Sequence, residues 1–309
     1  MLKKSLLATA LTSLVWGLSG TAVAEDAKAA EEPKSPHSMT GNVTFATNYV
    51  FRGLSQTNFK PAIQGTLEYG HASGLYVSFF ASNASWYGDA WEEAAPSQNS
   101  AVYGGVTGQN VAISSTLETD LYAGFRNKIG DSISYDIGAI YYYYPGKYEI
   151  AANQAPASAG GFGVKKPHTG EFYVGAGWNW ISAKLSYAVT EGVFGVADAR
   201  GSYYGELNAS YPIGDTGLTV IGHVGYWKFD GSMSVWSANG KKNDVYDLTD
   251  YKIGVTKDFL GFTFGAFYSG TTADKTTRLS NGSDLAVWGN RYGKSVGDNS
   301  LFLTVTKAF

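Results

Sequence analysis

The sequence predicts an all-β fold, a transmembrane antiparallel up-and-down β-barrel of about twelve strands. Three observations support this prediction. Apolar and polar side chains alternate in segments of roughly the 9–11 residues that cross a bilayer when tilted. The connections between these segments alternate between short and long. The chain ends in an alternating run, Leu301–Ala308, followed by a terminal Phe309, which is typical of the strand that closes such a barrel.

The first 24 residues predict a cleaved signal peptide. Lys3 and Lys4 precede a largely apolar stretch, and Ala22-Val23-Ala24 fits the small-x-small pattern before a cleavage site after Ala24. We expect residues 25–40 to be a disordered periplasmic leader and residues 41–309 to form an outer-membrane barrel.

Composition excludes several classes of protein. The chain has no cysteine, so disulfides, a lipidated cysteine anchor and thiolate metal sites are excluded. Removing the signal peptide leaves 21 basic and 26 acidic residues, a formal charge of −5, which gives no electrostatic basis for nucleic-acid binding. The 22 Tyr, 16 Phe, 8 Trp and 39 Gly suit a barrel in which one face of each strand meets lipid.

Each expected strand places apolar side chains on one face. In chain order these are Val43, Phe45, Tyr49 and Phe51; Ile63, Leu67 and Tyr69; Leu75, Val77 and Phe79; Leu121, Ala123 and Phe125; Ile133, Tyr135, Ile137, Tyr141 and Tyr143; Phe172, Val174, Ala176, Trp178 and Trp180; Leu185, Tyr187 and Val189; Tyr203, Leu207, Ala209 and Tyr211; Leu218, Val220, Val224 and Tyr226; Tyr251, Ile253 and Val255; Phe262, Phe264, Ala266 and Tyr268; and the C-terminal run.

Loop lengths predict which end of the barrel is which. The short connections are His71–Gly74, Asn127–Ser132, the Trp180–Ile181 step, Pro212–Gly217 and Asp258–Gly261. The longest alternate ones are Ala84–Ser115, Pro145–His168, Gly231–Asp247 and Thr271–Asn299. Short periplasmic turns and long extracellular loops are expected of an outer-membrane barrel with both termini in the periplasm. Aromatic residues near strand ends predict interfacial girdles, namely Tyr49, Phe51, Tyr141, Tyr143, Trp178 and Trp180.

The polar faces should line the lumen. Their ionisable residues are seven acids, four bases and one histidine, namely Arg52, Glu68, Glu118, Asp120, Arg126, Asp136, Glu171, Lys184, Glu206, His223, Asp250 and Lys252. An excess of acids favours cations or neutral solutes over anions. The alternative is mutual neutralisation, in which cross-strand pairs fill and brace a closed lumen.

Folding about the Pro212–Gly217 turn brings Glu206 opposite His223, and the preceding hairpin brings Lys184 beside Glu206. We therefore expect a lumenal row of Lys184, Glu206 and His223. A structural role for this row is favoured over a gate or a solute contact.

An outer-membrane enzyme is the rival class, and we expect no enzyme. His37, His71 and His168 fall in the leader, a turn and a loop edge, while His223 faces the lumen. No serine lies in a Gly-x-Ser-x-Gly motif. The Ser85–Glu93 loop mixes aromatic and acidic residues, which could stack a sugar or hold Ca²⁺, although a solvated surface loop is the default.

Thr47-Asn48-Tyr49-Val50-Phe51-Arg52-Gly53-Leu54-Ser55-Gln56-Thr57, with Lys60–Gly65 after it, resembles the opening of the TorF-type porins. This proteobacterial outer-membrane family also carries the domain label Gcw_chp. Ser73–Tyr76, Ala81–Asn83 and the terminal Phe309 extend the resemblance, whereas long loops and an outward Lys307 depart from it. The resemblance implies an outer-membrane pore of unassigned substrate. It also implies that Arg52 and Gln56 lie near the extracellular mouth, where Gly53 lets the chain bend.

The sequence therefore predicts a passive outer-membrane channel for small neutral or cationic hydrophilic solutes. The alternative is a plugged barrel with an adhesive, receptor or structural role. Expected partners are outer-membrane lipid, lipopolysaccharide and the barrel-assembly machinery, which would recognise the C-terminal strand and Phe309. We expect no cofactor, no metal and no nucleic acid.

Overall fold

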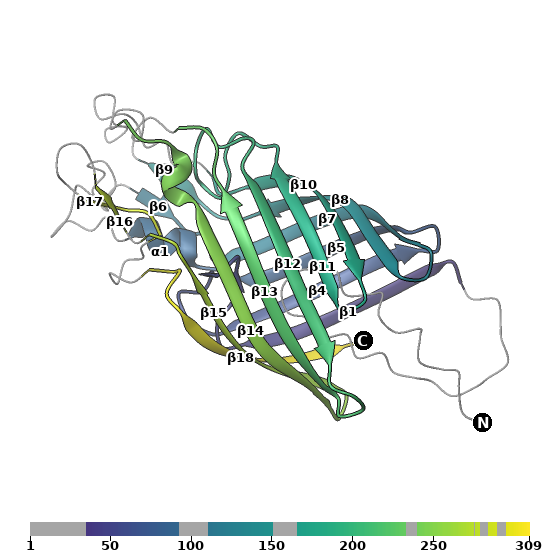
Figure 1. Cartoon of the computed structure of the whole chain (residues 1–309). Helices are drawn as coiled ribbons and strands as arrows, with labels where there is room; N and C mark the ends of the chain where they lie inside the picture. Colours follow the sequence, from purple (N-terminus) through teal and green to yellow (C-terminus); the bar gives the residue numbers. More distant parts are fainter. Residues whose placement is uncertain are drawn as a thin grey trace, which may run out of the picture.

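The computed structural model describes residues 35–92, 111–150, 166–232, 240–274, 276–278, 284–288 and 295–309. Twelve strands form one closed antiparallel barrel (Figure 1), which confirms the expected fold class. Around the ring they are β1 (His37–Ala46), β18 (Ser300–Ala308), β15 (Phe262–Thr271), β14 (Leu248–Phe259), β13 (Leu218–Lys228), β12 (Tyr203–Pro212), β11 (Ile181–Ala188), β10 (Thr169–Trp178), β8 (Ile133–Tyr143), β7 (Leu117–Ile129), β5 (Leu75–Asn83) and β4 (Ala62–His71).

The two ends of the barrel differ. Short turns join β4 to β5, β7 to β8, β10 to β11, β12 to β13 and β14 to β15, and the C-terminus lies at the same end (Figure 1). We call this the short-turn end. The opposite, long-loop end carries the small elements, namely β2 (Val50–Phe51), β3 (Leu54–Ser55), α1 (Trp86–Glu92), β6 (Val111–Ile113), β9 (Tyr148–Ile150), the 3-10 helix Asn243–Tyr246, β16 (Thr276–Arg278) and β17 (Asp284–Ala286).

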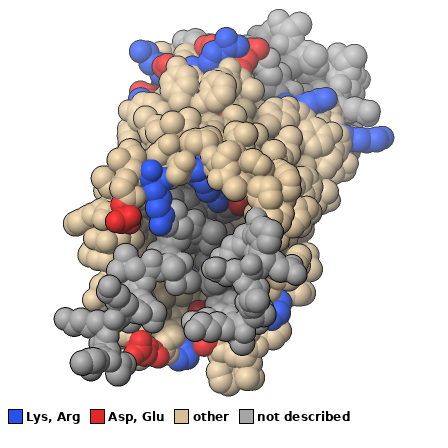
Figure 2. All heavy atoms as spheres, turned by 90° about the vertical axis from the view of Figure 1, so that its right-hand side faces the viewer, with Lys and Arg blue, Asp and Glu red and all other residues tan. Residues whose placement is uncertain are grey.

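The two faces of the wall follow the alternation of the sequence. In β18, Leu301 is 73% exposed whereas its neighbour Phe302 is 1% exposed. Because neighbouring side chains on a strand point to opposite faces, the exposed set faces outward and the shielded set faces the lumen. The exposed apolar side chains come from all twelve strands and form the outer surface that a bilayer-spanning barrel requires. Figure 2 shows the molecule from the short-turn side, with its charged side chains in scattered groups.

Within the described ranges, no helix is long and apolar enough to cross a membrane.

Closure of the ring involves the last residue of the chain. Gly41 N–H donates to the Phe309 carbonyl at 3.0 Å, and Phe309 N–H donates to the Gly41 carbonyl at 2.9 Å. The Phe309 ring covers Gly41 so closely that a Cβ atom there would lie 2.7 Å from it. Lys307 is exposed, donates to the Gly261 carbonyl at 2.9 Å and lies over the Phe262 ring. The C-terminal strand is therefore held at the short-turn end.

Two expectations about the first strand are wrong. The expected leader reached residue 40, but β1 begins at His37 and its first residues pair with β4, His37 opposite His71. The expected strand continued to Arg52, but β1 ends at Ala46. The segment after Ala46 turns into the barrel, and the signal peptide and its cleavage site lie outside the described residues.

Candidate functional site in the lumen

One connection fills the lumen. Residues 47–61, which we call the inserted segment, join β1 to β4, and residues 52–58 are all buried. Connecting segments normally run over the surface, because their backbone polar groups need water. The inserted segment contacts β7 through Tyr49, β8 and β13 through Phe51, and β10 through Arg52. These strands lie across the ring from β1, so the contacts pass through the lumen.

A tight hairpin lies at the centre of the inserted segment. Strands β2 and β3 pair Val50 with Ser55 and Phe51 with Leu54, leaving Arg52 and Gly53 as the two turn residues. Both have positive φ, 47° and 75°. Positive φ at both central positions is the geometry of a type I′ turn, which matches the twist of a hairpin. A Cβ atom at Gly53 would lie 2.3 Å from Thr271 and 2.6 Å from Asp250, so the tip is pressed against the wall at β15 and β14.

Arg52 anchors this hairpin. Its two terminal nitrogens donate to the two carboxylate oxygens of Glu171 on β10, at 2.9 and 2.6 Å. The side chains are 4% and 3% exposed, so this is a buried, bidentate ion pair. The guanidinium also lies over the rings of Phe51, Tyr204 and Trp227, with centroid distances of 4.9, 4.3 and 4.5 Å. Charge and aromatic contacts therefore both hold Arg52 in place.

Hydrogen bonds fix both arms of the inserted segment. The Tyr49 hydroxyl donates to Glu118 Oε1 at 2.5 Å, and the Ser55 hydroxyl donates to Asn48 Oδ1 at 2.7 Å. The Gln56 carbonyl accepts from the backbone N–H groups of Ser85 and Trp86, which seats the start of α1 on the segment.

The sequence-predicted lumenal residues lie at three heights. Those nearest the short-turn end are Glu68, Arg126 and Asp136; those near mid-barrel are Lys184, Glu206, His223 and Lys252; and those toward the long-loop end are Arg52, Glu118, Asp120, Glu171 and Asp250. Arg52 belongs to the inserted segment rather than to a strand.

At the level nearest the short-turn end, polar and charged groups pair between strands that have one or two other strands between them. Arg126 donates to Glu68 at 2.8 Å, and its guanidinium stacks 3.7 Å from the Tyr76 ring centroid. The Tyr76 hydroxyl donates to Asp136 at 2.8 Å and shares a short hydrogen bond with the Tyr173 hydroxyl.

The middle level holds the expected row. Lys184 lies directly opposite Glu206 in the register, and Glu206 Oε2 is 3.7 Å from His223 Nδ1. His223 pairs in register with Asn208, two residues from the expected partner Glu206. Its Nε2 lies 2.8 Å from Asp250, which also accepts from the Tyr204 hydroxyl at 2.8 Å. The row therefore continues to Asp250.

At the upper level, Glu118 and Asp120 lie two residues apart on the inner face of β7. They are 1% and 2% exposed, and neither forms an ion pair with a described residue. They differ in this respect from Glu68, Glu171 and Asp250, which face basic side chains.

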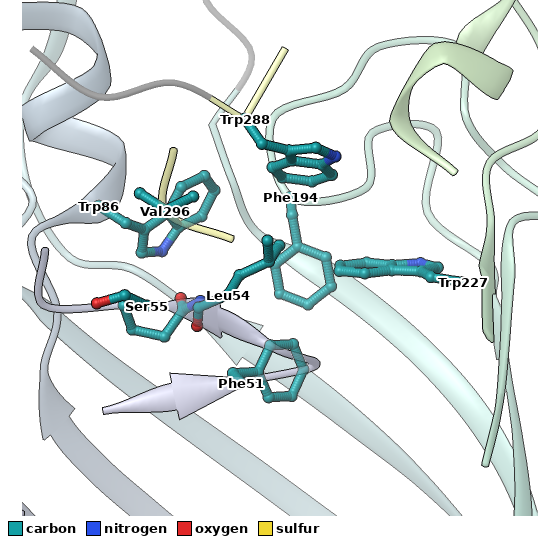
Figure 3. Close-up of a pocket in the computed structure, with 9 residues that line it drawn as sticks. Phe51, Leu54, Ser55, Trp86, Phe194, Trp227, Trp288 and Val296 are labelled. Carbon is teal, nitrogen blue, oxygen red and sulfur yellow. The ribbon is translucent and has the colours of Figure 1, made fainter. Parts of the chain in front are cut away.

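A small aromatic pocket lies above the hairpin (Figure 3), with room for about one water molecule. Its wall is formed by Phe51, Leu54, Ser55, Gln56, Trp86, Phe194, Trp227, Trp288 and Val296. The Trp227 ring lies 5.3 Å from the Phe194 ring and 6.1 Å from the Trp288 ring, measured between centroids (Figure 3). Ser55 donates its N–H to the Val296 carbonyl at 2.7 Å. The inserted segment is thus covered from the long-loop end as well.

The interfacial assignment of Tyr49 and Phe51 is wrong. Tyr49 is 7% exposed and Phe51 packs against Tyr142 and Trp227, whereas Tyr141, Tyr143, Trp178 and Trp180 are exposed as expected. The period-two pattern continues from residue 43 to residue 51, so the sequence gives no sign that β1 ends at Ala46. The sequence signal for the hairpin is the Arg52-Gly53 pair, because a glycine in a two-residue step between short strands is typical of a tight hairpin turn.

The expectation of a solvated loop at Ser85–Glu93 is wrong over Trp86–Glu92, and Glu93 lies outside the described residues. Residues Trp86–Glu92 form α1, in which Tyr87 and Asp89 are buried. Among the described residues, no three potential ligands of the His, Cys, Asp or Glu type are grouped to hold a metal ion.

The fold and the lumen define a membrane-spanning β-barrel that is occupied by one of its own loops. The chain belongs to the Gcw_chp family, described as a bacterial protein of unknown function, whose model matches residues 30–309. No curated protein matches the chain at a significant level.

Solved structures that match the chain include a porin and an outer-membrane channel. The KdgM porin in complex with disordered oligogalacturonate is 8% identical, with 88% of this chain and 99% of that chain covered and a TM-score of 0.43. An outer-membrane channel from Pseudomonas putida F1 is 14% identical, with 91% and 100% covered and a TM-score of 0.39. LpxR from Salmonella typhimurium is 10% identical, with 87% and 99% covered and a TM-score of 0.36.

Proposed function

We propose that this protein is an outer-membrane channel for the passive diffusion of small neutral or cationic hydrophilic solutes, with the inserted segment as its constriction. The observation that carries the proposal is that the lumen wall is lined with ionisable side chains and that a single loop, the inserted segment, occupies the space between them. Charged groups in a lumen suit a path for hydrated solutes, and the lumenal acids outnumber the bases. A cofactor or a chemical step has no part in this function.

Placement in the outer membrane follows from the same proposal. The exported chain would insert with its short-turn end in the periplasm and its long loops outside. The terminal strand with Phe309 would be the part that the barrel-assembly machinery recognises, and lipid and lipopolysaccharide would surround the exposed apolar wall.

One observation favours the alternative, a plugged barrel with an adhesive, receptor or structural role. Lumenal carboxylates such as Glu118, Asp136 and Glu171 are at most 3% exposed, so solvent barely reaches them while the inserted segment is in place. In that alternative the cross-strand pairs brace a permanently closed lumen.

Planar-bilayer recording separates the two functions. The matched variant removes the constriction: Ala46 and Ala62 are already a paired position of β1 and β4, so an Asn-Gly turn can replace residues 47–61. We call this the short-hairpin variant. We expect small, cation-preferring conductance steps from the natural protein and larger steps from the variant. If both are silent although folded, the plugged-barrel alternative replaces the channel.

A further inference from the structure

Glu118 and Asp120 are buried acids without a basic partner. Glu118 Oε1 accepts the Tyr49 hydroxyl, but Glu118 Oε2 and Asp120 Oδ1 accept no hydrogen bond. The charged groups that act on Asp120 are Glu118 and Glu171, both acids, and Arg52 already neutralises Glu171. The donors near this pair are neutral tyrosine hydroxyls, those of Tyr49 and Tyr144 toward Glu118 and that of Tyr122 toward Asp120. A buried carboxylate is best compensated by a cation, and this pair has none among the described residues, unlike Glu68, Glu171 and Asp250.

Further unpartnered groups belong to the same part of the lumen. The Tyr144 side chain is 1% exposed, and its hydroxyl reaches toward the Glu118 carboxylate in a contact that falls short of a fully aligned hydrogen bond. Ser78 on β5 is also 1% exposed with an unpartnered hydroxyl, and it lies opposite Tyr122, two residues from Asp120. The Tyr144 hydroxyl, on the residue after β8, thus joins the two acids of β7.

We propose that Glu118, Asp120 and Tyr144 form a binding site for a primary ammonium group on the path of the channel. A primary ammonium has three N–H donors and no acceptor, which matches two free carboxylate oxygens and a hydroxyl oxygen. The hydroxyls of Tyr49, Tyr122 and Tyr142 interact electrostatically with the same two acids and are further oxygen atoms that a cation can approach. A divalent metal suits the site less well, because a third acidic or imidazole ligand is not grouped with the pair in the described structure.

The inserted segment controls this site. Tyr49 belongs to that segment, and its hydroxyl occupies one oxygen of Glu118. Movement of the segment would free a further acceptor and open the pair to the lumen. The inference rests on the proposed channel function for its biological meaning, but the binding chemistry can be measured without any conduction.

Thermal unfolding of the full refolded barrel tests the site directly. Methylammonium chloride is compared with tetramethylammonium chloride at equal ionic strength, because tetramethylammonium has no N–H donor. We expect methylammonium to raise the midpoint more, and the Glu118→Gln/Asp120→Asn double variant to bind it roughly tenfold more weakly, as expected for the loss of charged hydrogen bonds. Asp131→Asn, in an exposed short turn, is the matched control and should respond like the natural protein.

Tyr144→Phe provides a second variant if the double variant does not fold, since it keeps both charges and removes one acceptor. Equal stabilisation by the two salts, or an undiminished methylammonium effect in every variant, would overturn the site and leave the pair holding a proton. A bilayer measurement separates this outcome from failure of the channel. Ammonium-specific stabilisation with silent bilayers would support the site and contradict the proposed function.

Discussion

Arg52 has two features that are unfavourable in a folded protein. It combines a positive φ of 47°, which is uncommon outside glycine, with burial of a permanent charge. Both are unfavourable by themselves and persist where surrounding contacts compensate them. Here the bidentate pair with Glu171 and the faces of Phe51, Tyr204 and Trp227 supply those contacts.

Removing one member of this pair should destabilise the barrel more than removing both. We expect Arg52→Ala or Glu171→Gln to cost about 3–5 kcal/mol, because each leaves a buried polar partner uncompensated. The double variant should cost clearly less than the sum of the two. Denaturant unfolding in detergent measures the three values, and strictly additive costs would contradict a direct Arg52–Glu171 coupling.

His168 provides a pH-sensitive contact just before β10. Its Nδ1 accepts the Tyr144 N–H at 3.2 Å, and its ring lies 4.7 Å from that of Tyr143. Burial lowers the pKa of His168, and the positive charge of Lys166 lowers it further. A histidine with a lowered folded pKa contributes stability above its unfolded pKa of about 6.5, and that stability is lost as the pH falls.

The thermal midpoint should therefore drop between pH 7.5 and pH 5 partly because of His168. In His168→Gln, which cannot gain a proton, we expect a smaller drop over the same window. If the variant and the natural protein show the same pH dependence, this residue does not contribute.

At the scale of elements, the inserted hairpin depends on the glycine at its tip. Gly53 has a φ of 75°, and a Cβ atom would clash with Thr271 and Asp250. We expect Gly53→Ala to cost at least about 2 kcal/mol, from the left-handed backbone together with the clash. Gly214→Ala is the control, since Gly214 has a φ of 49° and open space around it, and should cost about 1 kcal/mol. Equal unfolding free energies for the two variants would show that the tip does not press against the wall.

The sequence predicts the barrel strands well because each strand has one lipid-facing side. Runs such as Leu301–Val305 repeat this alternation, and the short turns follow from glycine-containing breaks. The same rule fails at Tyr49 and Phe51, since an apolar residue facing a filled lumen looks identical to one facing lipid. Periodicity reports that a side chain is shielded from water. It does not report whether lipid or protein provides the shield.

Partners across the lumen were harder to predict than partners along a hairpin. Lys184 and Glu206 lie on adjacent strands, so turn positions sufficed to place them together. Arg52 and Glu171 are separated by several strands of the ring, and they meet because a loop folds inward. The isolated Glu118–Asp120 pair could be placed on the inner face from the sequence, but its lack of a basic partner appears when all neighbouring strands are in position.

At the scale of the whole molecule, the protein is a twelve-stranded wall with an ionisable inner face and one loop folded into it. The strand pairing of the wall does not include the inserted segment, because β1 and β4 are paired up to Ala46 and Ala62, the residues that flank it. The state of the lumen should therefore depend on that segment rather than on the strands.

Thiol labelling tests this claim most directly, because the chain has no cysteine of its own. Ser186 on β11 is wholly buried, and Ser186→Cys changes one atom. With the inserted segment in place we expect a small, charged methanethiosulfonate reagent to label Cys slowly, and in the short-hairpin variant at least roughly tenfold faster, as for a site released from local protection. Rapid labelling with the segment in place, or equally slow labelling without it, would contradict the claim that residues 47–61 close the lumen.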